Sequence, residues 1–305
     1  MRRLFWGAVV LVAIVAGILF LGADYLLGYA LSPDADRTDT AKYYAKLREQ
    51  YPDVLPWLDS MRAAGMLRDT FAVMPSGERH YAILTGRPGT ERTAVLIHGW
   101  RNASVTMLQF AKVFHGLGYS CVLPDLHGHG LSEGDSVRMG WPDRLDVLHW
   151  IRPYATDTMV VHGVSMGAAT AMMLSAEPMP GRVRDLRIVE DCGYTSVRDE
   201  FAYQLREDFG LPEWPLLDVA DAICRWRYGW SFSGSSAEAQ LGRCRWPMLF
   251  IHGDSDTFVP TEMVHRLYSA HGGPKRLWVS RGVAHNRSLK LYPAAYADTL
   301  RAFLR

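Results

Sequence analysis

The spacing of hydrophobic and polar positions changes repeatedly along the chain, and this pattern predicts strands that alternate with helices. Short apolar runs rich in Val, Ile and Leu are separated by longer stretches with helical spacing. Such runs are typical of parallel strands covered by helices on both faces. The predicted strands are 94–97, 120–123, 159–162, 186–189, 248–252 and 277–280, and the predicted helices include 105–117, 144–152, 166–177 and 261–270.

The chain before these strands predicts a hairpin preceded by a helical extension. The segment FAVMPSGERHYAIL, residues 71–84, places Pro-Ser-Gly between two strand-like runs. Residues 31–69 are predicted to form an N-terminal extension with two short amphipathic helices. Ser32 or Asp39 could cap the first helix, and Pro52 and Pro56 punctuate the second. We therefore expect the main domain to span residues 70–305.

One interval interrupts the alternation. Between Cys192 and Arg245 lie about 50 residues rich in Trp, Arg, Asp and Gly, too many for a loop in a compact domain. We interpret this interval as a helical lid, about residues 194–244, inserted between two strands. Its aromatic residues could line a substrate pocket or form the lid's own core, and the sequence leaves both possibilities open; they are Trp214, Trp226, Tyr228, Trp230 and Phe232.

The N-terminus differs from the rest because residues 4–23 carry no charge. As a helix, this segment would be about 30 Å long, the hydrocarbon thickness of a bilayer. Arg2 and Arg3 precede it and Asp24 follows it, which favours a cytoplasmic N-terminus. Residues 1–30 are therefore predicted to be a single transmembrane anchor that holds the main body on the extracytoplasmic side. Removing them should leave a soluble, active body.

Two alternatives to a retained anchor remain open. Gly28-Tyr29-Ala30 could serve as the cleavage site of a signal peptide, and the protein would then be secreted or periplasmic. The segment could also be a buried core helix.

Composition and charge narrow the function classes. The chain has 305 residues, and a hydrophobic content of 49% is enough for one large domain with a sizeable core. Lys and Arg number 33 against 32 Asp and Glu, so the charge pattern gives no indication of nucleic-acid binding. The four cysteines show no CxxC spacing, which argues against a zinc site. Cys121 and Cys192 are predicted to be buried thiols, and Cys224 and Cys244 could pair in an oxidising compartment.

The strongest chemical signal is GVSMG, residues 163–167, at the end of a predicted strand and the start of a predicted helix. A chain that turns sharply there exposes the Ser165 hydroxyl and leaves the next backbone N–H free at the helix N-terminus. The flanking glycines remove the steric conflict of such a turn. A lone GxSxG is a weak signal, but this context predicts that Ser165 is a nucleophile.

A nucleophilic serine needs a base, and the base needs an orienting carboxylate. His285 is the predicted base because it follows the last predicted strand, in RGVAHNRS. Asp256, in IHGDSDTFVP, is the preferred acid, and Asp191 and Asp254 are rivals. Of the other histidines, His265 and His271 are interpreted as surface residues, whereas His162 and His252 are interpreted as packing residues.

Two backbone N–H groups are predicted to form an oxyanion hole, those of Met166 and of Trp100 in LIHGWRN. The segment DLHGHG, residues 125–130, contains a His-x-His that resembles a metal site. Because no fourth ligand is evident, we interpret it as a glycine-rich structural loop. No metal and no cofactor are predicted.

In this order of motifs the chain resembles the α/β-hydrolase superfamily. The resemblance runs from about residue 70 to the C-terminus through HGW, DLHGHGLSEG, GVSMG, HGDSDTFVP and GVAHNRS. EDCGYTS, residues 190–196, is similar to a group of bacterial, often membrane-anchored hydrolases near the serine aminopeptidase and monoacylglycerol lipase branch. The resemblance implies an α/β-hydrolase fold, the triad Ser165, Asp256 and His285, the oxyanion donors Trp100 and Met166, and no cofactor. A serine at the nucleophile position makes dehalogenase and epoxide hydrolase activities unexpected.

The sequence thus predicts a membrane-tethered serine hydrolase that cleaves an ester, or an amide, through an acyl-enzyme. Its partners would be a small-molecule ester or peptide substrate and the membrane. The ester is favoured because the aromatic lid suggests an apolar acyl site. The alternatives are a serine aminopeptidase and a non-catalytic binding protein on the same fold. A peptidase needs a carboxylate near the nucleophile for the substrate ammonium group, and the lid carboxylates are interpreted as solvated charges; they are Glu200, Glu207, Asp208, Glu213, Asp218 and Asp221.

Overall fold

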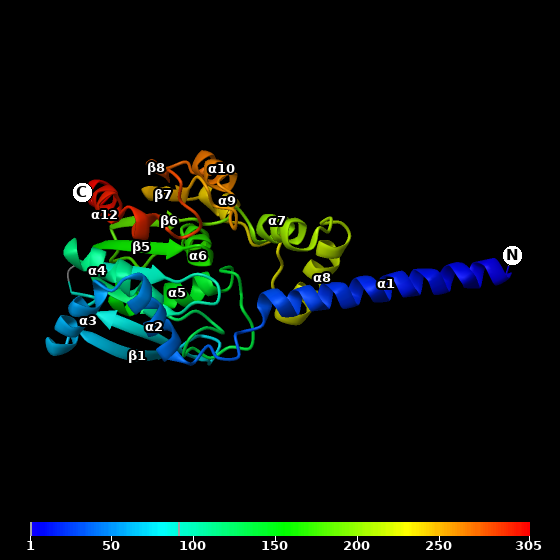
Figure 1. The fold of residues 1–305 in the computed structure, drawn as a ribbon, viewed down its shortest axis with the longest axis horizontal. Helices are drawn as coiled ribbons and strands as arrows, with labels where there is room; N and C mark the ends of the chain where they lie inside the picture. The colour runs from blue at the N-terminus through cyan, green and yellow to red at the C-terminus, as the bar shows by residue number, and fades with distance from the viewer. Residues whose placement is uncertain (1, 91) are drawn as a thin grey trace.

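The computed structural model describes residues 2–90 and 92–305, and its centre is a sheet of eight strands in the order β1-β2-β4-β3-β5-β6-β7-β8 (Figure 1). The first three strands in this order pair antiparallel, and all the other neighbours pair parallel. The strands are β1 Leu67–Val73, β2 Arg79–Thr85, β3 Arg92–Ile97, β4 Ser120–Pro124, β5 Thr158–Val164, β6 Asp185–Asp191, β7 Met248–Gly253 and β8 Lys275–Ser280.

Every predicted strand is present. The β1–β2 hairpin pairs Phe71 with Tyr81 around the predicted turn. Strand β1 begins at Leu67, so the sheet starts slightly before the expected domain boundary at residue 70. Local apolar patterning was a sufficient signal for the central strands, because the core buries both of their faces, whereas β1 and β8 at the edges are only partly buried.

Helices cover both faces of the sheet, which divides the core into two layers (Figure 1). Alternate residues of β3 point into different layers: Val95 and Ile97 into one, Ala94 and Leu96 into the other. The helices around the sheet are α2 Thr40–Gln50, α3 Val54–Ala63, α4 Leu108–Gly116, α5 Asp143–Ile151, α6 Met166–Leu174, α10 Glu262–Ala270, α11 Ser288–Leu291 and α12 Pro293–Phe303.

The N-terminal extension forms the two predicted helices, α2 and α3. Asp39, rather than Ser32, caps α2, because its Oδ1 accepts a hydrogen bond of 3.0 Å from the Ala41 N–H. Tyr43 of α2 and Leu58 of α3 are buried against the same core layer. The extension therefore packs on the domain, as expected.

The predicted lid lies between β6 and β7. It contains α7 Val197–Phe209, α8 Leu216–Tyr228 and α9 Ala237–Leu241. Some of its aromatic residues are buried, as expected for a pocket or a lid core, and others are exposed to solvent. Trp230 and Phe232 are buried, whereas Trp214 and Trp226 are 73% and 80% exposed.

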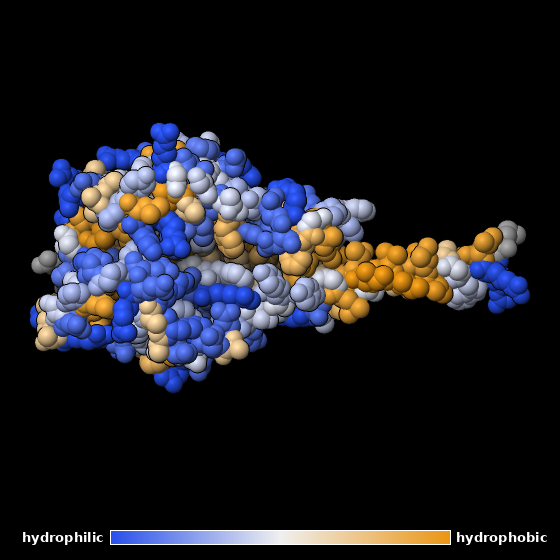
Figure 2. All heavy atoms as spheres, viewed as in Figure 1, coloured by the Kyte–Doolittle hydropathy of each residue, from blue (hydrophilic) through white to orange (hydrophobic). Residues whose placement is uncertain are grey.

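Helix α1, Arg2–Leu31, extends away from the body and is long and apolar enough to cross a membrane (Figures 1 and 2). None of its most apolar 18 residues is buried, which rules out the core-helix alternative. The end of α1 behaves differently. Ala23, Leu27 and Leu31 are buried, and Asp24 forms a 2.6 Å ion pair with Arg227 of α8. The expected boundary at residue 30 therefore needs revision, because the last turns of α1 pack on the lid.

One expectation about an individual side chain was wrong. His271 is buried, not on the surface, because the chain after α10 turns inward and places its ring 6.0 Å from that of Phe250. The sequence left open whether Cys224 and Cys244 pair; in the structure all four cysteines are free and buried. Burial raises the pKa of the Cys224 and Cys244 thiols, that of Cys224 to about 12.

Candidate active site

Ser165 lies at the sharp turn between β5 and α6, as the sequence predicts. Its backbone adopts φ 57° and ψ −120°, a strained conformation for a residue with a side chain. The turn requires glycine on both sides. A β-carbon at Gly163 would lie 2.0 Å from the Gly167 carbonyl oxygen, and one at Gly167 would lie 2.2 Å from the Ile97 carbonyl oxygen. The Ser165 N–H donates to the Asp191 carbonyl at 2.8 Å, which further fixes the turn.

Ser165 is joined to His285 and Asp256 by two hydrogen bonds. His285 lies in the loop between β8 and α11, and its Nε2 is 2.9 Å from the Ser165 hydroxyl. Its Nδ1 is 2.7 Å from Oδ2 of Asp256, in the loop after β7. The carboxylate can only accept when ionised, so Nδ1 carries the proton and Nε2 is free to accept from the serine.

The surroundings of Asp256 keep it ionised. Burial alone would raise its pKa, but hydrogen bonds from His252 and His285 lower it to about 2. Its second oxygen, Oδ1, accepts from the N–H groups of Phe258 and Val259, both at 3.0 Å. The carboxylate is therefore charged and fixed in position at neutral pH.

His252 has a role that the sequence interpretation missed. It was assigned to packing, but its Nε2 lies 3.4 Å from Asp256 Oδ2 and 2.9 Å from the Val259 carbonyl. Burial lowers the pKa of His252, but Asp256, Glu190 and the Val259 carbonyl together raise it, so the net shift is upward. The spacing of four residues between His252 and Asp256 gives no local signal, because many such pairs never meet.

The rival carboxylates have other partners. Asp191 Oδ2 accepts from the Tyr296 hydroxyl at 2.9 Å, and burial raises the pKa of Asp191 to about 6. Asp254 Oδ1 accepts from the Gly282 N–H at 2.6 Å. The structure thus brings His285 to Asp256 and to neither rival.

Trp100 and Met166, the predicted oxyanion donors, line the same cleft as Ser165. Met166 is the first residue of α6, and Trp100 follows Gly99, where a β-carbon would lie 3.3 Å from that of Ser165. In the described part of the chain, neither N–H is paired with an acceptor. Two free donors next to a serine hydroxyl can stabilise an oxyanion that forms there.

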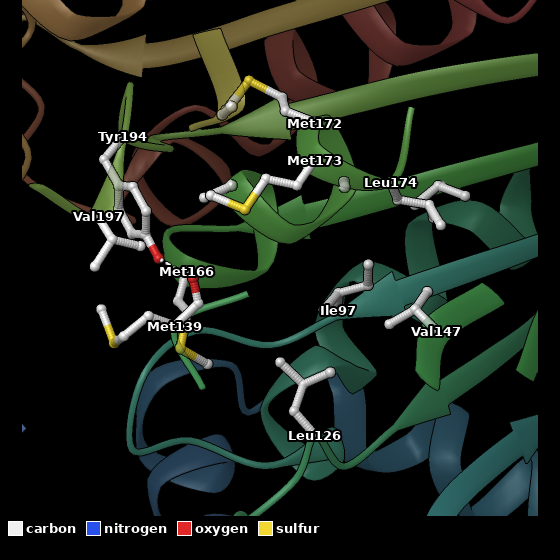
Figure 3. Close-up of a cluster of buried hydrophobic side chains, with 14 of the residues drawn as sticks. Ile97, Leu126, Met139, Val147, Met166, Met172, Met173, Leu174, Tyr194 and Val197 are labelled. Carbon is white, nitrogen blue, oxygen red and sulfur yellow. Dashed lines mark hydrogen bonds between the residues drawn. The ribbon is translucent and has the colours of Figure 1, made fainter. Parts of the chain in front are cut away.

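A mostly apolar cleft opens over Ser165. Its walls come from α1, α7 and α8, and its floor from the segments around Trp100, Met166 and Tyr194. Figure 3 shows Met139, Met166 and Tyr194 grouped together, and the Tyr194 hydroxyl donates to the Met139 carbonyl at 2.8 Å. The lining residues are Leu26, Leu27, Tyr29, Ala30, Trp100, Met139, Ser165, Met166, Tyr194, Glu200, Phe201, Gln204, Leu205, Asp208, Phe209, Leu217, Ala220, Phe232 and Phe258.

Several residues of this cleft were not predicted. The ring of Phe258 lies 5.0 Å from that of His285, and residues 26–30 of α1 form part of the wall. Of the predicted lid aromatics, Phe232 lines the cleft and Trp226 does not. These contacts arise from packing between segments that are distant in the sequence, so the local sequence pattern cannot predict them.

The sequence predicts that all six lid carboxylates are solvated, but two of them are buried. Glu200 is only 3% exposed and lines the cleft; its Oε1 accepts from Gln204 at 2.9 Å, and no partner is seen for Oε2. Burial raises the pKa of Glu200 to about 8. Asp221 is also buried, and it accepts from the Phe232 N–H at 2.6 Å. The other four lid carboxylates are exposed, as predicted.

The DLHGHG loop is held by hydrogen bonds within the protein. Asp125 accepts from the N–H groups of Ser104 at 2.6 Å and Leu131 at 2.8 Å, and His127 contacts Glu78 at 2.9 Å. Among the described residues, the one group with spacing suited to a metal ion is Cys192 with Asp256 and His285. Burial raises the pKa of the Cys192 thiol, so it is protonated and a poor ligand.

The comparisons with known proteins concern the fold of the chain. Residues 94–304 match the model of the alpha/beta hydrolase family. The uncharacterized protein YqkD of Bacillus subtilis (strain 168) is 29% identical over 220 residues, which covers 70% of this chain and 72% of that protein.

Two solved structures share the fold. The esterase Pf2001 of Pyrococcus furiosus aligns with a TM-score of 0.62 and 20% identity, over 78% of this chain and 91% of that one. A membrane phospholipase A, described as a bacterial virulence factor, aligns with a TM-score of 0.56 and 18% identity, over 100% of this chain and 98% of that one.

Proposed function

Because the chain belongs to the alpha/beta hydrolase family, we propose that it is a serine hydrolase that cleaves a carboxylic ester through an acyl-enzyme. The observation that carries this proposal is the hydrogen-bonded series from Ser165 through His285 to Asp256 at a glycine-flanked turn. The fold alone supports only a hydrolase, since one fold hosts many reactions. The serine mechanism depends on these three side chains.

The proposed reaction begins when the Ser165 oxygen attacks the ester carbonyl carbon and His285 Nε2 takes the serine proton. The negative charge that forms on the carbonyl oxygen is stabilised by the N–H groups of Trp100 and Met166. His285 then gives its proton to the departing alcohol, which leaves the acyl group on Ser165. Water then attacks the carbonyl carbon of the acyl-enzyme while His285 takes a proton from the water. His285 gives this proton to the Ser165 oxygen, and the carboxylic acid leaves. Asp256 stabilises the imidazolium and holds its tautomer throughout.

The cleft supports an ester with an apolar acyl group. Its walls are mainly aliphatic and aromatic side chains, and none of the described residues that line it is Lys or Arg. Apolar walls with few polar groups are typical of sites that hold an acyl chain. An anionic substrate group would find no Lys or Arg to pair with among the described residues that line the cleft.

Glu200 supports a second candidate, a serine aminopeptidase. A carboxyl group with one unpaired oxygen, in the same cleft as the nucleophile, is what an ammonium group would require. However, the raised pKa of Glu200, about 8, means that it is mostly protonated at neutral pH in the free protein. A neutral carboxyl attracts a cation weakly, so the ester remains the favoured substrate.

A comparison of two substrate classes separates these candidates. We expect kcat/KM for p-nitrophenyl butyrate to exceed that for every member of a set of aminoacyl p-nitroanilides at equal enzyme and pH. Glu200→Gln should leave this order unchanged, and Glu207→Gln on the exposed face of α7 is the matched control. An anilide that is cleaved faster than the ester, and whose advantage disappears in Glu200→Gln but not in Glu207→Gln, would establish the peptidase instead.

We also propose that α1 is retained as a single membrane span, with the body on the extracytoplasmic side. Cleavage after Ala30 would remove Leu26, Leu27, Tyr29 and Ala30 from the wall of the cleft. A signal peptide that is discarded would not be expected to complete a binding site. These contacts support an anchor rather than a cleaved signal.

Two truncations test this role of α1. A chain that lacks residues 1–21 keeps Ala23, Leu27 and Leu31, and we expect it to be soluble and to hydrolyse p-nitrophenyl butyrate like the full chain in detergent. Removal of residues 1–31 should lower both the Tm and kcat/KM, because each buried leucine contributes about 1.5–3 kcal/mol. Equal Tm and kcat/KM in the two truncations would show that the end of α1 contributes nothing to the body.

A further inference from the structure

Helix α8 has an exposed apolar face in addition to the face that packs in the core. Trp214 and Trp226 are 73% and 80% exposed, and Ala222 between them is exposed as well. A shallow groove runs along this face past Pro215, Val219 and Trp226. Two large indole rings in water are unfavourable unless something covers them. We refer to this surface, residues 214–226, as the lid face.

The lid face lies at the level where the apolar part of α1 ends. A β-carbon at Gly22 would lie 3.4 Å from the Leu216 side chain at the start of α8. Arg227, near the other end of α8, forms its 2.6 Å ion pair with Asp24. Both contacts fall at the border between the uncharged residues 4–23 and the first acidic residue of the chain.

The same level carries another exposed aromatic residue. Tyr25 of α1 is 66% exposed and follows Asp24 directly. Tryptophan and tyrosine gather at the two interfaces of a bilayer, where the ring reaches apolar chains and the polar edge remains in the headgroup layer. In Figure 2, hydrophobic residues continue from α1 onto the adjoining end of the body.

We propose that the lid face rests in the headgroup layer of the bilayer that α1 spans, with Trp214 and Trp226 inserted as interfacial anchors. The partner is a lipid surface, because the exposed apolar area adjoins a helix whose most apolar 18 residues are all uncovered. The proposal rests on the membrane span proposed for α1 and does not depend on the reaction.

This placement determines how a substrate reaches Ser165. The cleft wall formed by Leu26, Leu27 and Ala30 begins about one turn of helix beyond the end of the apolar stretch. Leu217 and Ala220 of α8 form the facing wall. In this placement the cleft lies beside the headgroup layer, so an ester whose acyl chain lies in the bilayer would reach Ser165 from that side rather than from bulk water.

Tryptophan quenching by brominated lipid tests the contact. The full chain would be reconstituted in phosphatidylcholine vesicles with bromine near the headgroup end of the acyl chains. Trp6→Phe would serve as the background, because Trp6 lies in the proposed span. We expect bromine-dependent quenching in this background. Adding Trp214→Phe and Trp226→Phe should reduce the quenching to the level seen in lipid without bromine.

Trp57→Phe in the same background is the matched control, because Trp57 lies on α3, at the end of the body away from α1 (Figure 1). It should leave the bromine-dependent quenching intact. Quenching that is absent in the background, or that survives the loss of both Trp214 and Trp226, would overturn the proposal. The measurement needs no turnover and gives the same result in a Ser165→Ala chain, so failure of the proposed reaction would not be mistaken for failure of the membrane contact.

Discussion

Replacing Ser165 by alanine is expected to lower kcat for p-nitrophenyl butyrate by about 10⁶-fold, the loss that follows removal of the nucleophile from an established serine hydrolase. The variant keeps His285 and the two backbone donors, so a small residual rate should remain. The strained backbone at Ser165 accepts alanine as readily as serine, and the fold should persist. The variant's circular dichroism spectrum and Tm would check this.

Ser269→Ala on the exposed surface of α10 is the matched control and should retain full activity. A Ser165→Ala protein that is folded and still turns over the ester at a rate near that of the unchanged chain would remove Ser165 from the reaction. The proposed reaction would then lack a nucleophile, because the sequence predicts no other serine at such a turn.

Replacing Asp256 by asparagine is expected to lower kcat by about 10⁴-fold. An amide in place of the carboxylate can donate to His285 Nδ1, which would move the imidazole proton to Nε2. The ring could then no longer accept the proton of Ser165. The lost charge would also leave the imidazolium unsupported. Activity should be measured in detergent with the full chain.

Asp191→Asn is the informative comparison, because Asp191 is the nearby buried carboxylate. Its side chain accepts from Tyr296 and makes no hydrogen bond with His285, so we expect a loss of at most about tenfold. If both variants are folded and Asp191→Asn is the more damaging, the acid has been assigned to the wrong residue.

The parts of this molecule that the sequence predicts are those whose signals are local. The central strands of the sheet are buried on both faces and therefore show continuous apolar runs. The turn at Ser165 requires glycine at 163 and 167 for a steric reason that holds in any surroundings. His285 and Asp256 could be chosen because each follows a strand, and the ends of parallel strands meet at one edge of the sheet.

The end of α1 and the inner face of α7 could not be predicted in the same way. After Asp24, residues 25–31 continue an apolar helix, and only the contact with α8 shows that Leu27 belongs to the body. Glu200 and Glu207 have the same side chain on one helix. Rotation of α7 about its axis decides which of them is buried, and packing against the cleft sets that rotation.

His252 and His271 show the same limit. Both are histidines near the end of a strand or a helix, and their local sequences suggested packing for one and exposure for the other. The structure places His252 against Asp256 and buries His271 beside Phe250. When a side chain contacts another helix or strand, its burial and its partners depend on the fold and not on its neighbours in the sequence.

The most direct test of the proposed serine mechanism is to treat the full chain with a fluorophosphonate probe and locate the adduct by peptide mass spectrometry. The probe reacts with a serine that is activated by a neighbouring base. We expect a single adduct on the peptide that contains Ser165, and no adduct in the Ser165→Ala chain. An unlabelled, folded protein would contradict the account and favour a non-catalytic protein on the same fold, and an adduct on a different serine would contradict the assignment of Ser165.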